Sequence, residues 1–233
     1  MLNRQEHQKL MLSILKDIFM DTRIAHLLGF KGGTCLYFAY ELPRFSVDLD
    51  FDLLVPEEEN LVFEKISSIM KKHGTIKTAD NKRVSMSWSI SYGQGLQKLF
   101  VEISKRNFYS RYELKNILGL SIQIMQQEDI FANKLIAALE RKRTAIRDFY
   151  DINFMFNKFW NYNPKIIQER SQKNLKVFFQ DLIDLVERYD RSNILSEIGS
   201  LLSEKDKIYV KERLLVELTI SLKNEIQRYE QFE

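Results

Sequence analysis

The sequence predicts an α+β fold, in which a small mixed sheet with flanking helices is followed by a C-terminal helical bundle. Two observations support this prediction. Up to about residue 125, runs with helical apolar spacing are interspersed with runs in which apolar and polar residues alternate one by one, as strand residues do. Beyond that point the spacing is almost purely helical. We therefore expect a mixed α/β domain over residues 1–126 and a helical domain over residues 127–233.

The predicted elements of the mixed domain follow the chain in order. Residues 4–20 have apolar spacing near 3.6 and form a first helix. A short strand over 26–30 runs into a glycine pair, after which a helix over 34–42 is stopped by Pro43. The later elements are a strand over 45–55, a helix from Pro56 to Gly74, an antiparallel hairpin of 83–92 and 96–104 turning at Gly93–Gly95, and short strands within 113–125.

The second half of the chain is predicted to contain helices only. Two helices cover 127–143 and 144–160, and residues 164–231 supply three or four more. No motif indicates a role for the helices after residue 160. Basic residues form two groups, which are Arg141, Lys142, Arg143 and Arg147, and Lys71, Lys72, Lys77, Lys82 and Arg83. With a net charge of +3, these groups support a nucleic-acid partner only weakly, because most such runs are solvated surface.

The composition is that of a globular protein, with 233 residues of which 45% are hydrophobic and 29% charged. The single cysteine, Cys35, excludes an internal disulfide framework or a cysteine-rich zinc site and fits a reducing cytoplasm. No apolar run approaches the roughly 18 residues that a membrane helix needs, and the N-terminal segment lacks a signal peptide's apolar core. We therefore expect a cytoplasmic protein with no membrane partner.

The segment FSVDLDFDLLV, residues 45–55, places three aspartates on one side of a strand. Strand residues two apart point to the same side, so Asp48, Asp50 and Asp52 share the face opposite the apolar residues. Like charges on one face repel, and aspartate is disfavoured in strands. A solvated polar face explains one or two such acids more readily than three. Carboxylates are ligands that Mg²⁺ prefers, together with substrate phosphates, so the row predicts a divalent metal site for Mg²⁺ or Mn²⁺.

Gly32 and Gly33 lie between the first predicted strand and the helix after it. Glycine lets a ligand approach the backbone closely, and the N-terminus of a helix offers N–H groups and a positive dipole end to phosphate. A Gly-Gly pair alone is commonly a plain turn. Followed fifteen residues later by Asp48 and Asp50 on an amphipathic strand, the pair predicts a combined site for a metal and a nucleoside triphosphate (NTP).

These residues resemble a known family signature. The segment KGGTCLYFAYELPRFSVDLDF is similar to the nucleotidyltransferase pattern h-G-[GS]-x-n-D-h-[DE], and its K-G-G-T…R-x-S-x-D-h-D-F form resembles the AbiEii-type nucleotidyltransferases. The resemblance implies a nucleotidyltransferase-type sheet and the transfer of NMP from an NTP to an acceptor, expected to be RNA and tRNA-like. It also implies a toxin of a toxin–antitoxin or abortive-infection system, with a cognate antitoxin as partner.

The resemblance also assigns roles to individual residues. Asp48 and Asp50 are expected to bind the metal. Glu102, on a neighbouring strand, is the candidate for a third carboxylate that completes the metal site and helps to deprotonate the acceptor; its alternative interpretation is a surface acid. The expected nucleotide-binding residues are Gly32, Gly33, Thr34, Arg44, Ser46 and Arg147. The phosphates are expected at Gly32–Thr34, where the Thr34 hydroxyl could replace the serine of other superfamily members. Asp52 is expected to support its neighbours or to be solvated.

In the helical half, the resemblance extends to a K-x-x-A…R-D-x-x-D pattern, matched by Lys134, Ala137, Arg147, Asp148 and Asp151. It implies that Lys134 neutralises triphosphate charge and that Asp151 is a further active-site acid, orienting the lysine or the acceptor. Without the resemblance, an Arg147–Asp151 ion pair four residues apart and a snorkelling lysine explain the pattern more simply.

The sequence is also compatible with other functions. The acceptor of a nucleotidyltransferase could be a protein or a small molecule such as an aminoglycoside. A catalytically silent NTP-binding module is a third interpretation, and a phosphate-binding scaffold with structural acids is a fourth. The sequence selects neither the NTP nor the oligomeric state.

Overall fold

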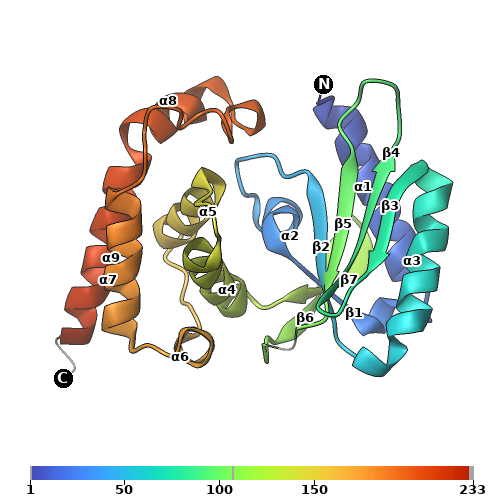
Figure 1. The fold of residues 1–233 in the computed structure, drawn as a ribbon, viewed down its shortest axis with the longest axis horizontal. Helices are drawn as coiled ribbons and strands as arrows, with labels where there is room; N and C mark the ends of the chain where they lie inside the picture. The colour runs from blue at the N-terminus through green and yellow to red at the C-terminus, as the bar shows by residue number, and fades with distance from the viewer. Residues whose placement is uncertain (1, 107, 231–233) are drawn as a thin grey trace. The chain divides into compact units, whose positions relative to one another are not determined.

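The computed structural model describes residues 2–106 and 108–230, with Glu230 described by its backbone only. The chain divides into two compact units, Met1–Gln126 and Gln127–Glu233, which we call the sheet unit and the helical unit (Figure 1). The predicted α+β class is confirmed, since the first unit holds a seven-stranded mixed sheet and the described part of the second is built from helices.

The sheet unit contains three α-helices and seven strands among its described residues. They are α1 (Arg4–Met20), β1 (Leu28–Lys31), α2 (Gly32–Tyr40), β2 (Asp48–Leu53), α3 (Glu59–His73), β3 (Thr75–Asn81), β4 (Ser85–Ser91), β5 (Leu99–Ser104), β6 (Tyr112–Ile117) and β7 (Leu120–Met125). The strand order is β3-β4-β5-β2-β1-β7-β6. The pairs β1–β7 and β2–β5 are parallel, and the other neighbours are antiparallel.

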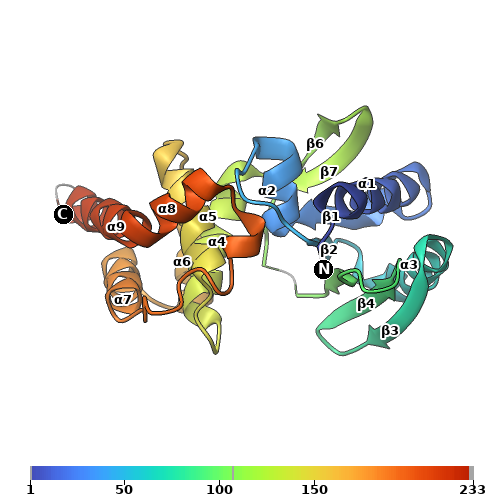
Figure 2. The same ribbon diagram turned by 90° about the horizontal axis from the view of Figure 1, so that it is seen from above.

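One row of apolar side chains crosses the sheet in register and forms the centre of its core. The row consists of Ile124, Phe30, Phe51, Ile103 and Met86, all fully buried. Helices α1 and α3 cover this face, while α2 lies on the opposite face over β1 and β2 (Figure 2). Because strand side chains alternate, the residues next along each strand point to the α2 side. The aspartates of β2 therefore lie on the face that carries α2.

Several predicted boundaries differ from the structure. Helix α2 begins at Gly32, two residues earlier than predicted, and β2 covers only the centre of the predicted strand over 45–55. Strand β3 was not predicted, because its sequence TIKTADN holds a single strongly apolar residue, Ile76, and gives no alternating pattern. It forms as an edge strand paired with β4. The predicted hairpin is confirmed as the antiparallel pair of β4 and β5.

The described part of the helical unit contains α4 (Gln127–Glu140), α5 (Ile146–Asn157), α6 (Pro164–Ser171), α7 (Leu175–Glu187), α8 (Glu204–Glu212) and α9 (Leu214–Glu230). The two predicted helices before residue 160 are confirmed, with a loop where they meet, and the described residues after it hold four. Asn133 on α4 links to α6 by accepting a hydrogen bond from Arg170 at 2.6 Å. Across both units, no described helix is long and apolar enough to cross a membrane.

Candidate functional site

The glycine pair that opens α2 lies against the aspartate face of β2. Gly32 has a φ of +79°, in the left-handed region that favours glycine. A Cβ placed on Gly32 would lie 2.3 Å from Oδ2 of Asp50. The antiparallel register, in which Lys31 is opposite Asp50, brings the two segments together. The backbone angle and the close carboxylate both require glycine here, and the Asp50 carboxylate rests directly on the backbone where α2 begins.

Gly33 is approached from the segment that leads into β2. A Cβ at this position would lie 2.8 Å from Nη2 of Arg44 and 2.9 Å from Oγ of Ser46. Both of these predicted nucleotide-binding residues are buried, and Arg44 also donates a hydrogen bond to the Phe45 carbonyl at 3.2 Å. The structure therefore brings both residues to the glycine pair. Their burial fits a role in bracing the loop.

Thr34 connects the first turn of α2 to the start of β2. Its side chain is fully buried, and its hydroxyl donates a hydrogen bond to the Asp48 carbonyl. The position of this hydroxyl therefore does not support the expectation that it contacts a phosphate. The N-cap residue of α2, Lys31, makes no side-chain capping bond. Its side chain therefore does not satisfy the backbone N–H groups at the start of the helix.

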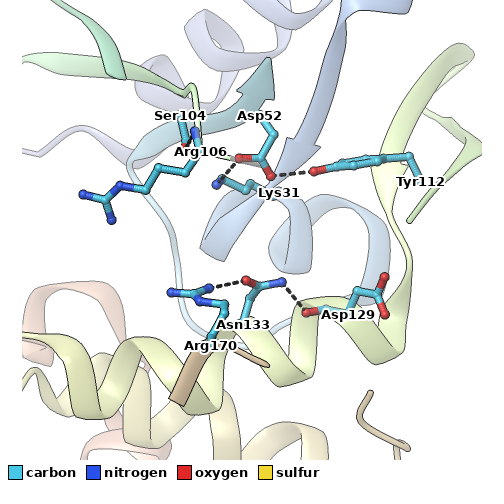
Figure 3. Close-up of polar contacts among 8 residues, drawn as sticks. All are labelled: Lys31, Asp52, Ser104, Arg106, Tyr112, Asp129, Asn133 and Arg170. Atoms are coloured by element: carbon cyan, nitrogen blue, oxygen red, sulfur yellow. Dashed lines mark hydrogen bonds and ion pairs between the residues drawn. The ribbon is translucent and has the colours of Figure 1, made fainter. Parts of the chain in front are cut away.

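The third aspartate of the row is a buried anchor (Figure 3). Asp52 is only 7% exposed, and its two carboxylate oxygens contact different partners. Lys31 Nζ lies 2.5 Å from Oδ1, and the Tyr112 hydroxyl donates to Oδ2 at 2.5 Å. The ring of Tyr112 fits because residue 29 is glycine, where a Cβ would lie 2.1 Å from Cε1 of the ring. Of the two expectations for Asp52, support of its neighbours fits and solvation does not.

The carboxylates of Asp48 and Asp50 are half-buried, whereas Glu102 is exposed on β5. Asp50 is paired with Glu102 in the parallel register of β2 and β5. Among the described residues, no three His, Cys, Asp or Glu side chains converge as a metal-binding group. Mg²⁺ is typically held by one or two carboxylates together with substrate phosphates. Asp48 and Asp50, beside the glycine pair, fit an ion that a bound nucleotide helps to hold, and the role of Glu102 stays a prediction.

His7 is a contributor to this region that the sequence did not reveal. It is fully buried on α1, its Nε2 lies 2.7 Å from the Val47 carbonyl and its Nδ1 lies 2.7 Å from the Tyr92 hydroxyl. A carbonyl only accepts, so Nε2 carries the proton and Nδ1 accepts from the tyrosine. Burial lowers the pKa of His7 below its ordinary value of 6.5. A neutral His7 therefore holds the residue that precedes Asp48.

The helical unit contains a separate buried group of charges. Lys134 Nζ lies 2.7 Å from Oδ2 of Asp151 and 3.6 Å from Oδ1 of Asp148, and Arg141 also pairs with Asp148. The aspartate side chains are 0% and 1% exposed, respectively. Asp148 meets its cations as ion pairs, since neither of its oxygens has hydrogen-bond geometry. The residue pattern K…D-x-x-D thus forms one cluster that orients the lysine.

The basic group between α4 and α5 is partly neutralised. Arg141 pairs with Asp148, and Arg143 lies 3.2 Å from Glu197. Neither Lys142 nor Arg147 forms an ion pair with any residue that the structure describes, so the simple Arg147–Asp151 pair is not made. This group therefore offers a nucleic acid fewer available charges than its sequence indicates.

Comparisons with known proteins indicate the family and the fold of the chain. A family described as "Nucleotidyl transferase AbiEii toxin, Type IV TA system" matches residues 13–207. The crystal structure of JHP933 from Helicobacter pylori is similar over 99% of this chain and 96% of that chain, with 25% identity and a TM-score of 0.62. A crystal structure of a proposed nucleotidyltransferase from H. pylori is similar over 99% and 97%, with 25% identity and a TM-score of 0.64. No curated protein gives a match. Because the family match covers most of the sequence, the chain belongs to the AbiEii family of nucleotidyl transferase toxins of type IV toxin–antitoxin systems.

Proposed function

We propose that the chain is a metal-dependent nucleotidyltransferase that transfers NMP from an NTP to an RNA acceptor. The observation that carries this proposal is the contact between Gly32 and Asp50, where a Cβ would lie 2.3 Å from the carboxylate. It makes the N-terminus of α2 and the aspartate face of β2 one continuous surface. A triphosphate lying on Gly32 and Gly33, at the positive end of α2, would have its α-phosphate beside Asp48 and Asp50.

The residues present fit one divalent ion, held by Asp48 and Asp50 together with the nucleotide. When bound, such an ion neutralises phosphate charge and polarises the reacting phosphoryl group. Thr34 and His7 hold the carbonyls of residues 48 and 47, so they fix the start of the strand that carries Asp48. Lys31 neutralises Asp52, which leaves that acid committed to the fold.

In the reaction, the acceptor hydroxyl oxygen forms a bond to the α-phosphorus as the bond to pyrophosphate breaks. Glu102, on the strand beside Asp50, is proposed to accept the hydroxyl proton. Lys134, oriented by Asp151, is proposed to supply positive charge to the triphosphate, and Arg147 to add a phosphate contact. The family implies an antitoxin partner, and we propose a cytoplasmic toxin whose antitoxin is encoded nearby.

The proposal is tested by incubating the protein with each α-³²P-labelled NTP, Mg²⁺ or Mn²⁺, and total cellular RNA. We expect label on RNA, lost on removal of the metal and in Asp48→Asn. The matched control is Asp184→Asn, which changes an exposed aspartate on α7 and should leave transfer intact. Label in the protein or small-molecule fraction instead would select one of the other acceptors. No label in any fraction, or equal labelling by Asp48→Asn, would contradict the enzymatic proposal.

The toxin role has a separate test in growing cells. Expression is expected to arrest growth with the unmodified chain and not with Asp48→Asn or Lys134→Met at matched protein levels. Arrest that persists in both variants would show that toxicity does not depend on the proposed site. Rescue by a neighbouring open reading frame would identify the antitoxin.

A further inference from the structure

The sheet face that carries Asp48 and Asp50 continues across β5, β4 and β3 as a polar surface. In register, Asp50 is followed by Glu102 on β5, Ser87 on β4 and Asp80 on β3. The row beside it runs from Asp48 on β2 to Phe100 on β5 and then to Ser89 on β4. Every member of these two rows is polar except Phe100.

Phe100 is 47% exposed at the centre of this polar surface. A single exposed apolar side chain is common on proteins and needs no explanation by itself. The position of Phe100 is more specific, because it is directly opposite Asp48 and two residues before Glu102 on the same strand face. The residue opposite it on β4 is Ser89, which is polar and buried. An aromatic ring is thus presented next to the proposed reacting centre.

The order of the strands places Phe100 on the acceptor side of that centre. The glycine pair follows β1, which is one neighbour of β2, and Phe100 belongs to β5, which is the other. If the triphosphate lies on the glycines, pyrophosphate leaves toward β1. In-line displacement then requires the attacking oxygen to approach from the opposite side, where β5 presents Glu102 and Phe100.

We infer that Phe100 is a stacking platform for the terminal nucleobase of a single-stranded RNA acceptor. This inference rests on the proposed function and names the residue that receives the acceptor. Exposed aromatic rings bind bases by stacking with little sequence preference, and single-stranded ends are the form of RNA whose bases are free to stack. Exposed Lys98 and Arg106 lie just beyond the two ends of β5 and provide charge for the RNA backbone.

The test measures binding of a fluorescein-labelled single-stranded RNA of about ten nucleotides by fluorescence anisotropy. Phe100→Leu keeps an apolar side chain but cannot stack, and Phe100→Trp keeps a stacking ring. We expect Phe100→Leu to weaken RNA binding by about 5- to 100-fold and Phe100→Trp to bind within a few-fold of the unmodified chain. NTP binding, measured separately by calorimetry, should be unchanged in both. A thermal unfolding curve for each variant confirms that it is folded.

Equal RNA binding by Phe100→Leu and the unmodified chain would overturn the inference, as would an unmodified chain that binds no single-stranded RNA. Either result leaves the transferase proposal to be decided by the labelling experiment. Conversely, an unmodified chain that binds RNA through Phe100 but transfers no label would contradict the proposed function and leave the stacking role in place.

Discussion

The two units each pair a lysine with a buried aspartate, but they differ in what surrounds the pair. In the helical unit, Lys134 and Arg141 face Asp148 and Asp151, so two cations balance two acids that are at most 1% exposed. In the sheet unit, Lys31 and Tyr112 hold Asp52, the most buried of three aspartates in a row. The other two stay half-buried beside the glycine pair. The difference in burial separates the acids that the fold encloses from the two that are exposed enough to meet a ligand.

The helical cluster should give the largest effect on stability. Lys134→Met removes one cation from two buried carboxylates, and breaking a buried pair from one side costs about 3–5 kcal/mol of unfolding free energy. Urea unfolding measures this loss. The control is Lys223→Met, because Lys223 is 56% exposed and 3.3 Å from Glu187, and such surface pairs contribute about 0–1 kcal/mol.

A double variant sharpens this prediction. In Lys134→Met with Asp151→Leu, the uncompensated charge is removed as well, so part of the lost stability should return. If the double variant is as unstable as the sum of the single variants, the two side chains are not coupled and the cluster does not act as a unit.

The glycine pair offers a matched comparison within the sheet unit. Gly32→Ala and Gly119→Ala both place a side chain at positive φ, +79° and +85° respectively, at a cost of about 1–3 kcal/mol. Only at residue 32 does the new Cβ meet a carboxylate, because nothing lies within 4 Å of a Cβ at residue 119. We expect both variants to lose stability and Gly32→Ala alone to lose NTP affinity, measured by calorimetry. Equal NTP affinity in the two variants would contradict the phosphate role of the loop.

The anchor at Asp52 should show a smaller effect on stability than the helical cluster does. Tyr112→Phe removes the hydroxyl donor and leaves one oxygen of a buried carboxylate without it, which costs about 1–3 kcal/mol. The change leaves Lys31 in place. Expressed as free energies, the loss in transfer rate at saturating NTP should therefore be smaller than the loss in stability. A melting temperature equal to that of the unmodified chain would show that the contact contributes nothing.

The smallest predicted effect concerns pH. Because burial lowers the pKa of His7 below 6.5 in the folded chain, the unfolded chain takes up this proton first as pH falls. The contribution of neutral His7 to stability is therefore complete above about pH 6.5 and declines below it. His7→Gln, which keeps an N–H donor, should remove this part of the pH dependence. Unfolding free energies at about pH 7.5 and pH 5.5 measure it, and an unchanged dependence would contradict the assignment.

Much of the fold follows from periodicity, but the strand that periodicity missed shows its limit. The alternation in β2 and the helical spacing of α1 are local signals, and both elements were predicted. Strand β3 carries one strongly apolar residue, Ile76, and is stabilised by pairing with β4 instead of by burying a face of its own. The predicted start of α2 is two residues late, because glycine is a poor helix former. Glycine occupies position 32 because the carboxylate of Asp50 lies beside it.

The candidate site was predictable as far as one continuous motif reached. The glycines, Arg44, Ser46 and the aspartates of residues 48–52 lie within about twenty residues of one another, and the structure brings them together. The supporting contacts join residues far apart in the chain. Tyr112 lies 60 residues from Asp52 and His7 lies 40 residues from Val47. No spacing rule predicts such contacts, and those of Asp52 indicate that this aspartate serves the framework.

The most direct test of the account compares two aspartates of the same strand, Asp48 and Asp52. Single-turnover transfer and thermal unfolding are measured for Asp48→Asn and Asp52→Asn. We predict that Asp48→Asn lowers the transfer rate by at least about 10²–10³-fold and lowers the melting temperature less than Asp52→Asn does, because Asp48 is the less buried of the two. Asp52→Asn should lower the melting temperature by about 2–8 °C, as a loss of roughly 1–2 kcal/mol would, and reduce transfer far less. The reverse pattern, or full transfer by Asp48→Asn, would contradict the division of the aspartate row into a ligand-binding part and a structural part.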